Sequence, residues 1–186
     1  MELRSWFSNI FGNDKNTTAP ETATEVKILD DRKAVFTPYK GDFENDPDVL
    51  KCIDAIARNG AKMHPRHIRN FAGKMENLKD NLYSLLAKRP NEVQNAYQFY
   101  YQVISNLELY NDSFIYVQRD ENLNVTGLYP LNFSEGKYYE YKGQIWLKFK
   151  FGRTKERFVA YDDCIHLTRF VGEDGLFGGS PKPIIK

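Results

Sequence analysis

The sequence predicts an α+β fold, with a mainly antiparallel sheet packed against two or three helices. Between residues 46 and 111, apolar side chains recur at helical spacing in segments bounded by cap residues and prolines. After residue 113, the pattern changes to short apolar and alternating segments separated by turn residues, as in a sheet. An apolar fraction of 41% beside 27% charged residues is that of a folded, soluble domain.

The first 25 residues are expected to form an arm and a mobile linker ahead of one α+β domain at residues 26–186. An apolar stripe at the amino terminus predicts a short helix, which is marginal alone and needs a docking surface. Its residues are Leu3, Trp6, Phe7, Ile10 and Phe11. The stripe fits a terminal helix packed on protein, with a partner-binding or membrane-surface arm as the alternative reading. Residues 12–25 are too polar to offset the entropy of ordering.

Two helices are expected before the longest one. Asp46 is a good N-cap, and Pro47 suits a first helical turn because its missing amide needs no partner. The expected buried stripe of this helix is Val49, Ile53, Ile56 and Gly60, with Leu50 and Ala57 beside them. After an extended stretch at residues 61–71, a shorter helix is expected on Leu78, Leu82, Leu85 and Leu86. It must end by Arg89, because the residue before a proline is pushed out of the helical region.

The longest helix is expected to begin at Asn91, whose side chain can accept a hydrogen bond from the first turn. Its expected buried face is Val93, Tyr97, Tyr100, Ile104 and Leu107, which recur at spacings of three and four. Asn111 and Asp112 should end the helix, since both residue types make local turn hydrogen bonds and tolerate left-handed backbone.

Strands are expected at residues 34–37, 113–118, 124–129, 137–141, 144–151, 157–160 and 164–170. Residues 120–122 and the pair Lys142-Gly143 read as hairpin connections. Along residues 144–151, odd-numbered side chains should face the core and even-numbered ones the other side, which is the pattern of a half-buried antiparallel strand.

The charge balance and the two cysteines point to a cytoplasmic protein without a strong electrostatic field. With 26 basic and 25 acidic residues, the net charge of +1 gives no general attraction for nucleic acid or an acidic membrane. Cys52 and Cys164 are expected to be buried free thiols. No apolar run approaches membrane-spanning length, so no membrane partner is expected.

The candidate histidines and aspartates do not form a catalytic, cofactor or metal site by their spacing. His64 and His67 lack further ligands at metal-binding spacing, so no metal is expected. His166 alternates with apolar neighbours and fits a packed or interface histidine. Asp162 and Asp163 lie close to His166 in sequence, but aspartates before a strand are common for turn formation alone. We therefore expect no catalytic residue and no cofactor.

A basic strand pair is the best candidate for nucleic-acid or partner contact. Its residues are Lys142, Trp146, Lys148, Lys150, Arg153, Lys155 and Arg157. Lysine and arginine could hold phosphates while an aromatic ring stacks on a base. Lysine also occurs on solvated sheet edges, where it prevents edge-to-edge pairing, so this alternative stays open.

Four motifs in order resemble the portal proteins of tailed bacteriophages, in the branch typified by phage HK97. They are the turn Arg89-Pro90-Asn91, the turn Tyr110-Asn111-Asp112-Ser113-Phe114, the strand at residues 125–131, and the ending at residues 162–181 with its aspartate, histidine and Gly-Ser-Pro elements. The family usually has glycine then asparagine where this chain has Asn111 and Asp112. Asparagine is the next-best residue for positive φ, so the turn can survive the change.

The resemblance implies the wing-like, amino-terminal portion of a portal protein, without the stem and clip that would follow. Such a protein is a structural, non-enzymatic subunit of a dodecameric ring at one capsid vertex, through which DNA is packaged and ejected. Its implied partners are other portal subunits, capsid and terminase, within a virion assembled in the cytoplasm of the bacterial host. The alternatives are a small cytoplasmic nucleic-acid-binding module that uses residues 142–157, and a hydrolase for which the sequence offers no constellation.

Overall fold

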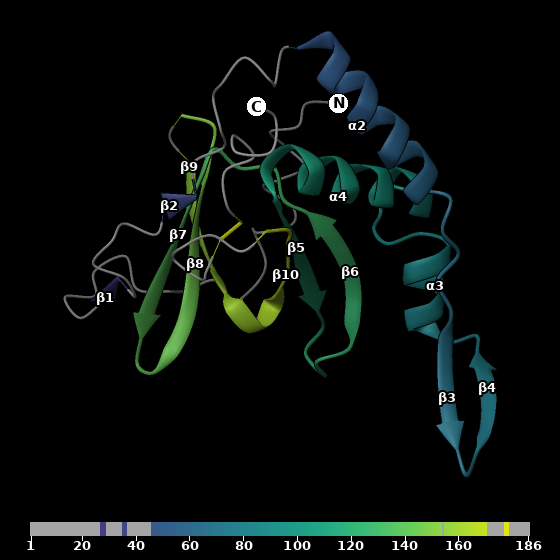
Figure 1. Ribbon diagram of the computed structural model, residues 1–186. Helices are drawn as coiled ribbons and strands as arrows, with labels where there is room; N and C mark the ends of the chain where they lie inside the picture. Colours follow the sequence, from purple (N-terminus) through teal and green to yellow (C-terminus); the bar gives the residue numbers. More distant parts are fainter. Residues whose placement is uncertain (1–26, 29–34, 37–45, 154, 171–176, 179–186) are drawn as a thin grey trace. The chain divides into compact units, whose positions relative to one another are not determined.

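The computed structural model describes residues 27–28, 35–36, 46–153, 155–170 and 177–178. The chain divides into two compact units (Figure 1). The sheet unit comprises Met1–Thr37 and Asn132–Asp162, and the helical unit comprises Pro38–Leu131 and Asp163–Lys186. The expected amino-terminal helix, the linker at 12–25 and the boundary at residue 26 lie outside the described residues. All the strand pairs are antiparallel, and the predicted α+β class is confirmed.

The sheet unit is built on a long meander of three strands. The order is β1-β7-β8-β9, and β2 also pairs with β7. The bounds are β1 Lys27–Ile28, β2 Val35–Phe36, β7 Glu135–Tyr141, β8 Gln144–Phe151 and β9 Lys155–Ala160. Lys142 and Gly143 both have positive φ, 51° and 74°, between β7 and β8. This is the tight two-residue connection that the sequence predicts.

One face of this sheet forms the core of the unit. Leu147 and Phe149 of β8 are 0% exposed, and Tyr138 and Val159 are buried beside Leu147 on the neighbouring strands. The predicted alternation along β8 is therefore confirmed at its centre. Ile145 is 41% exposed, because it lies next to the turn where the packed face ends.

The described residues of the helical unit form three helices, a three-stranded sheet and a separate hairpin. The sheet order is β10-β5-β6, and β3 pairs with β4. The bounds are α2 Pro47–Gly60, β3 His67–Phe71, β4 Lys74–Leu78, α3 Asn81–Ala87, α4 Ala96–Tyr110, β5 Asp112–Arg119, β6 Val125–Pro130 and β10 Cys164–Thr168. A 3-10 turn, Tyr161–Asp163, directly precedes β10 in the chain.

Helix α2 begins as predicted. The Asp46 carboxylate accepts from the amides of Asp48 and Val49. The helix buries Ala57, whereas Leu50 and Ile56 are 39% and 48% exposed, so the expected stripe is too wide. The helix buries a narrow seam because its partner is another helix, α4, which contacts only one line of side chains.

Helix α4 begins at Ala96, five residues after Asn91, where its start was predicted. Its N-cap is Asn95, which accepts from the Gln98 amide, while the Gln98 side chain accepts from the Asn95 amide. This reciprocal capping box fixes the helix start. The predicted buried face is wrong at Val93 and Tyr97, which are 59% and 43% exposed.

Asn91 is buried, and it joins the turn before α4 to the sheet. Its side-chain Nδ2 donates to the Leu128 carbonyl at 2.8 Å, and its side-chain Oδ1 accepts from the backbone amides of Val93 and Gln94. The Pro90 carbonyl accepts from the Leu128 amide, also at 2.8 Å. The turn Arg89-Pro90-Asn91 therefore docks on β6, and the Asn91 side chain shapes this turn.

The core of the helical unit lies between α4 and the sheet. Phe99 and Val103 of α4 pack with Ile115, Val117 and Leu128 of β5 and β6. At the other end of α4, Asn111 adopts the left-handed backbone conformation, with φ of 58°, and ends the helix as predicted.

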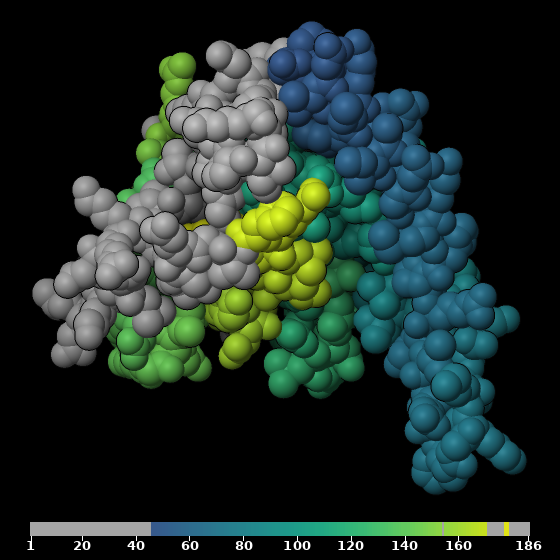
Figure 2. Space-filling model, viewed as in Figure 1, coloured from purple at the N-terminus to yellow at the C-terminus, as the bar shows by residue number. Residues whose placement is uncertain are grey.

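The hairpin β3–β4 was not predicted as a pair. Residues 61–71 were predicted to be extended, but Leu78 was assigned to the following helix and in fact ends β4. Ala72 and Gly73 make a two-residue turn with φ of 50° and 78°. In the space-filling view the hairpin stands out from the body of the helical unit, at the lower right (Figure 2).

The two cysteines differ from each other. Cys52 is exposed, so the prediction that it is buried is wrong; it lies on the solvent side of α2, away from the seam with α4. Cys164 is partly buried at the start of β10, and desolvation raises the pKa of its thiol to about 12. In the part of the chain that the structure describes, no helix combines the length and apolarity needed to cross a membrane.

Candidate functional site

A buried polar cluster joins the start of β5 to β10 and to the chain beyond it. The antiparallel register places His166 opposite Phe114 and Thr168 opposite Asp112. The Asp112 side chain is 0% exposed and that of His166 is 5% exposed, with 2.7 Å between Asp112 Oδ1 and His166 Nε2. The Thr168 hydroxyl lies 3.4 Å from the same carboxylate oxygen and 3.0 Å from His166 Nε2. We call these three residues and Gly178 the latch.

Gly178 completes the latch from a distant part of the chain. Its amide donates to Asp112 Oδ2 at 2.8 Å, so both carboxylate oxygens have hydrogen-bonding partners. An added Cβ at this position would lie 2.4 Å from the Asn111 carbonyl oxygen. Only glycine therefore fits so close to the left-handed turn that ends α4.

Aromatic rings cover the latch. The imidazole of His166 stacks on the ring of Phe114, with centroids 4.0 Å apart and planes inclined by 11°. Phe177 packs edge-on against both rings at 6.2 Å. Phe114 is 0% exposed and Phe177 is 4% exposed. An Asp-His-Thr set can resemble catalytic machinery, but substrate could not reach this one, so its geometry supports a structural role.

Of the other histidine and aspartate candidates, His67 and Asp163 each contact one ionisable side chain. His67 Nδ1 is 2.8 Å from Asp80 Oδ2, and Asp80 also accepts from the Tyr83 amide as the N-cap of α3. The hydrogen bond from the Tyr83 amide is the main cause that lowers the pKa of the Asp80 carboxyl; desolvation opposes it, and the His67 contact adds to the lowering. Asp163 accepts from Arg119 Nε at 3.0 Å. Across the described ranges, His, Cys, Asp and Glu side chains form no group of three suited to a metal ion.

The candidate basic surface carries acidic partners. Lys137, Lys148 and Lys150 lie with Glu135 and Glu156 on one face of the β7–β9 sheet. Lys137 Nζ is 2.8 Å from Glu135, and Lys148 Nζ is 2.7 Å from Glu156. The hydrogen bond with Lys137 lowers the pKa of the Glu135 carboxyl, against a smaller effect of desolvation. Paired lysines offer less attraction to phosphate than the sequence pattern implied.

The remaining members of that surface are dispersed. Trp146 is only partly exposed and lies between Tyr139 and Ala160 in the register. Lys142 lies in the β7–β8 turn, 5.2 Å from the Tyr141 ring centroid. Arg157 is paired in register with Phe149, so it belongs to the opposite face of the sheet from Lys148. Arg153 and Lys155 are exposed near the β8–β9 connection.

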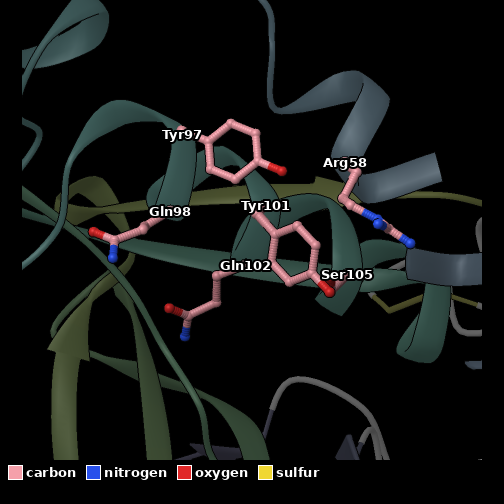
Figure 3. Close-up of a pocket in the computed structure, with 6 residues that line it drawn as sticks. All are labelled: Arg58, Tyr97, Gln98, Tyr101, Gln102 and Ser105. Carbon is pink, nitrogen blue, oxygen red and sulfur yellow. The ribbon is translucent and has the colours of Figure 1, made fainter. Parts of the chain in front are cut away.

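An open groove of about 450 Å³, which we call the α2–α4 groove, lies beside α4 in the helical unit. It is lined by Arg58 of α2 and by five residues of α4, which are Tyr97, Gln98, Tyr101, Gln102 and Ser105 (Figure 3). The rings of Tyr97 and Tyr101 stack with centroids 6.4 Å apart. The Tyr101 hydroxyl donates to Asp54 Oδ1 at 2.9 Å, and this hydrogen bond is the main reason that its pKa is raised.

Comparison with protein families assigns this fold. A model of the family described as "Phage portal protein" matches residues 47–186. The chain belongs to the phage portal protein family. The latch, the α2–α4 groove and the β3–β4 hairpin all lie within the region that matches this portal family.

Solved structures of particle proteins share the fold of this chain. The chain is similar to a protein in the neck of a native gene transfer agent particle computed with C12 symmetry, at 18% identity and TM-score 0.53, over 76% of this chain and 37% of that one. It is also similar to a protein in the virion of a native gene transfer agent, at 20% identity and TM-score 0.58, over 76% and 37%. A third match, from the neck of an empty particle computed with C6 symmetry, has 20% identity and TM-score 0.58 over 75% and 38%.

The chain thus spans about 37% of the length of the structures that it matches. The comparison with curated proteins gives no match. The portal resemblance stated from the sequence motifs is confirmed at the level of the family. Sequence reasoning missed the latch, because it assigned Asp112 only to the end of a helix and treated His166 separately. The available signal was the position of each polar residue next to apolar strand residues, Asp112 at the start of β5 and His166 between Ile165 and Leu167.

Proposed function

We propose that the protein is a structural subunit of a portal ring, which occupies one capsid vertex and through which DNA is packaged and ejected. The family match over residues 47–186 carries this proposal. The fold likeness to proteins of a particle neck supports it, since one of those necks was computed with C12 symmetry. A dodecamer of this chain is the expected assembly.

The role that we infer is structural rather than catalytic. The side chains of Asp112 and His166 in the latch are 0% and 5% exposed, so they are shielded from substrate. Buried, fully hydrogen-bonded polar groups rigidify a fold and specify one arrangement of its segments. The latch would hold Gly178 against the turn that begins β5 and so keep these two distant parts of the sequence together.

Capsid and terminase are the further partners of this proposal, with the virion as the final location and the bacterial cytoplasm as the place of assembly. The segment described here would supply the outer part of the ring and contacts between subunits. A prophage or phage genome is the expected source. Direct contact with the passing DNA is not required of this segment.

The location is tested on purified particles. Gold-labelled antibody against an epitope tag on the subunit should mark one vertex per particle, and tagged particles should retain packaged DNA. Label distributed over the whole shell, or recovered only with free protein, would contradict a portal role. A matched control is the same tag on the major capsid protein, which should label the entire surface.

A further inference from the structure

The β3–β4 hairpin exposes apolar side chains that its own subunit leaves uncovered. Phe71 and Met75 are each 78% exposed, and Ile68 is 50% exposed. A two-stranded hairpin is marginally stable alone, and exposed apolar groups on such an element mark an interaction surface. The hairpin therefore has the character of an arm that is covered when it meets a partner.

The strand register separates the hairpin into two chemically different faces. Ile68 pairs with Asn77, and Asn70 pairs with Met75, so these four uncharged residues share one face. The other face carries His67, Arg69, Phe71, Lys74, Glu76 and Leu78. The neutral face combines two apolar side chains with two amides, and it is the face suited to an uncharged surface.

The hairpin is fixed at its base. His67, the first residue of β3, contacts Asp80 at 2.8 Å, and Asp80 caps α3. An arm held in this way loses less conformational entropy on docking than a free loop would. Its direction relative to α3 is set before any partner arrives.

The groove beside α4 has matching chemistry. Two tyrosine rings and two glutamine amides line it, and the charge of its one arginine, Arg58, is balanced by Asp54. Tyr97 is 43% exposed, so the groove has apolar surface that an occupant would cover. Neither the groove nor the neutral hairpin face would bring an unpaired charge into the contact.

A ring requires two different complementary surfaces on each subunit. Contacts between subunits of a cyclic ring are head-to-tail, so a projection on one copy meets a hollow on the next. The hairpin and the groove are such a pair, and both belong to the helical unit. We propose that the neutral face of the β3–β4 hairpin docks in the α2–α4 groove of a neighbouring copy of this chain. This inference rests on the proposed function, because it requires a ring.

Disulfide trapping tests the contact directly. In full-length subunit carrying Cys52→Ser and Cys164→Ser, Met75→Cys is combined with Tyr97→Cys and the assembled protein is oxidised. A ladder of cross-linked dimers and higher species is expected, forming about tenfold faster than in the control, because docking holds the two thiols at high effective concentration. The control pairs Met75→Cys with Leu123→Cys, since Leu123 is 70% exposed in the β5–β6 turn, outside the groove.

A second experiment removes the apolar contact without new thiols. Ile68→Ser with Met75→Ser should weaken ring assembly by roughly tenfold in the concentration at half-assembly, as expected for losing apolar interface contacts. Lys74→Ser, on the other face of the same hairpin, should assemble like the unaltered protein. Far-ultraviolet circular dichroism should be unchanged in both variants, since the altered side chains are exposed.

The outcomes separate the two proposals. If the unaltered protein forms rings while Met75→Cys links to Leu123→Cys as fast as to Tyr97→Cys, the docking inference is overturned and the ring stands. Unchanged assembly of the Ile68→Ser/Met75→Ser variant would overturn it as well. A protein that forms no ring at any concentration would contradict the proposed function, and this inference with it.

Discussion

Substitution of Gly178 by alanine should be one of the most damaging single-methyl changes in this protein. The added Cβ would lie 2.4 Å from the Asn111 carbonyl oxygen and 2.8 Å from the carbonyl carbon. Neither atom is free to move, because Asn111 holds the left-handed end of α4 and its carbonyl accepts from the Arg169 amide at 2.8 Å. The Gly178 backbone must move instead, and its hydrogen bond to the buried Asp112 carboxylate lengthens or breaks.

Two contributions set the magnitude. Overpacking against fixed backbone costs about 1–3 kcal/mol. A lost hydrogen bond to a buried charged group costs about 1.5–3 kcal/mol. Since one movement relieves the overlap and breaks the bond, we expect a total of roughly 2–4 kcal/mol rather than the full sum.

Gly60→Ala is the matched control. Its added Cβ would also lie 2.4 Å from another atom, but that atom is Cδ1 of Ile104, the far end of a flexible side chain. The isoleucine can rotate away, and alanine favours the helix over glycine by about 0.5–1 kcal/mol. The two effects should leave the stability within about 1 kcal/mol of the unaltered protein.

Urea unfolding followed by circular dichroism gives the change in the free energy of unfolding for both variants. Amide hydrogen exchange along β5 and β10 then locates the loss, which should appear around the latch in Gly178→Ala and not in Gly60→Ala. A destabilisation below about 0.5 kcal/mol in Gly178→Ala, with unchanged exchange, would refute this reading of the close approach.

Four further predictions concern other parts of the chain. Phe99→Ala should cost about 3–5 kcal/mol in urea unfolding, since Phe99 is 2% exposed in the α4 core; a cost below about 1 kcal/mol would contradict this packing. Cys52 should be alkylated at pH 8 well before Cys164, whose pKa of about 12 keeps its thiol protonated; equal rates in the native protein would contradict the burial. The stabilisation linked to Cys164 should be present below the ordinary thiol pKa of 9.0 and should fall as pH rises toward about 12, as urea unfolding at several pH values would show. Lys148→Ala with Lys150→Ala should leave binding to short duplex DNA unchanged in gel-shift assays, and a salt-dependent loss would favour the nucleic-acid alternative.

Local signals in the sequence predicted local structure well. Asp46 and Pro47 mark the start of α2 correctly, Asn111 ends α4, and Lys142-Gly143 turns β7 into β8. Each of these features depends on a few neighbouring residues and on backbone preferences that a sequence displays. The alternation of buried and exposed side chains in β8 could be predicted because it too depends only on neighbouring residues.

The errors arose where two local signals competed or where the partner was distant. Asn91 and Asn95 are both good N-caps, and each is followed three residues later by a glutamine, Gln94 and Gln98, whose amide donates to the asparagine side chain. The local pattern is therefore the same at both positions and does not identify Asn95 as the true helix start. The β3–β4 hairpin was missed because its apolar residues face solvent, so no buried face gives it a period.

The latch was not predictable from neighbouring residues at all. Asp112 and His166 are 54 positions apart, and their contact depends on the register between β5 and β10. A one-residue shift of that register would move every side chain of β10 to the opposite face. The family motifs placed these residues in order along the chain, but the pairing emerged only from the structure.

The number of subunits in the assembled protein tests the central claim most directly. Native mass spectrometry of the full-length protein should give a closed ring, with twelve copies expected from the portal resemblance. Electron microscopy of the same sample should show rings with a central channel. A full-length protein that remains strictly monomeric at high concentration, although folded, would contradict the assignment as a portal subunit.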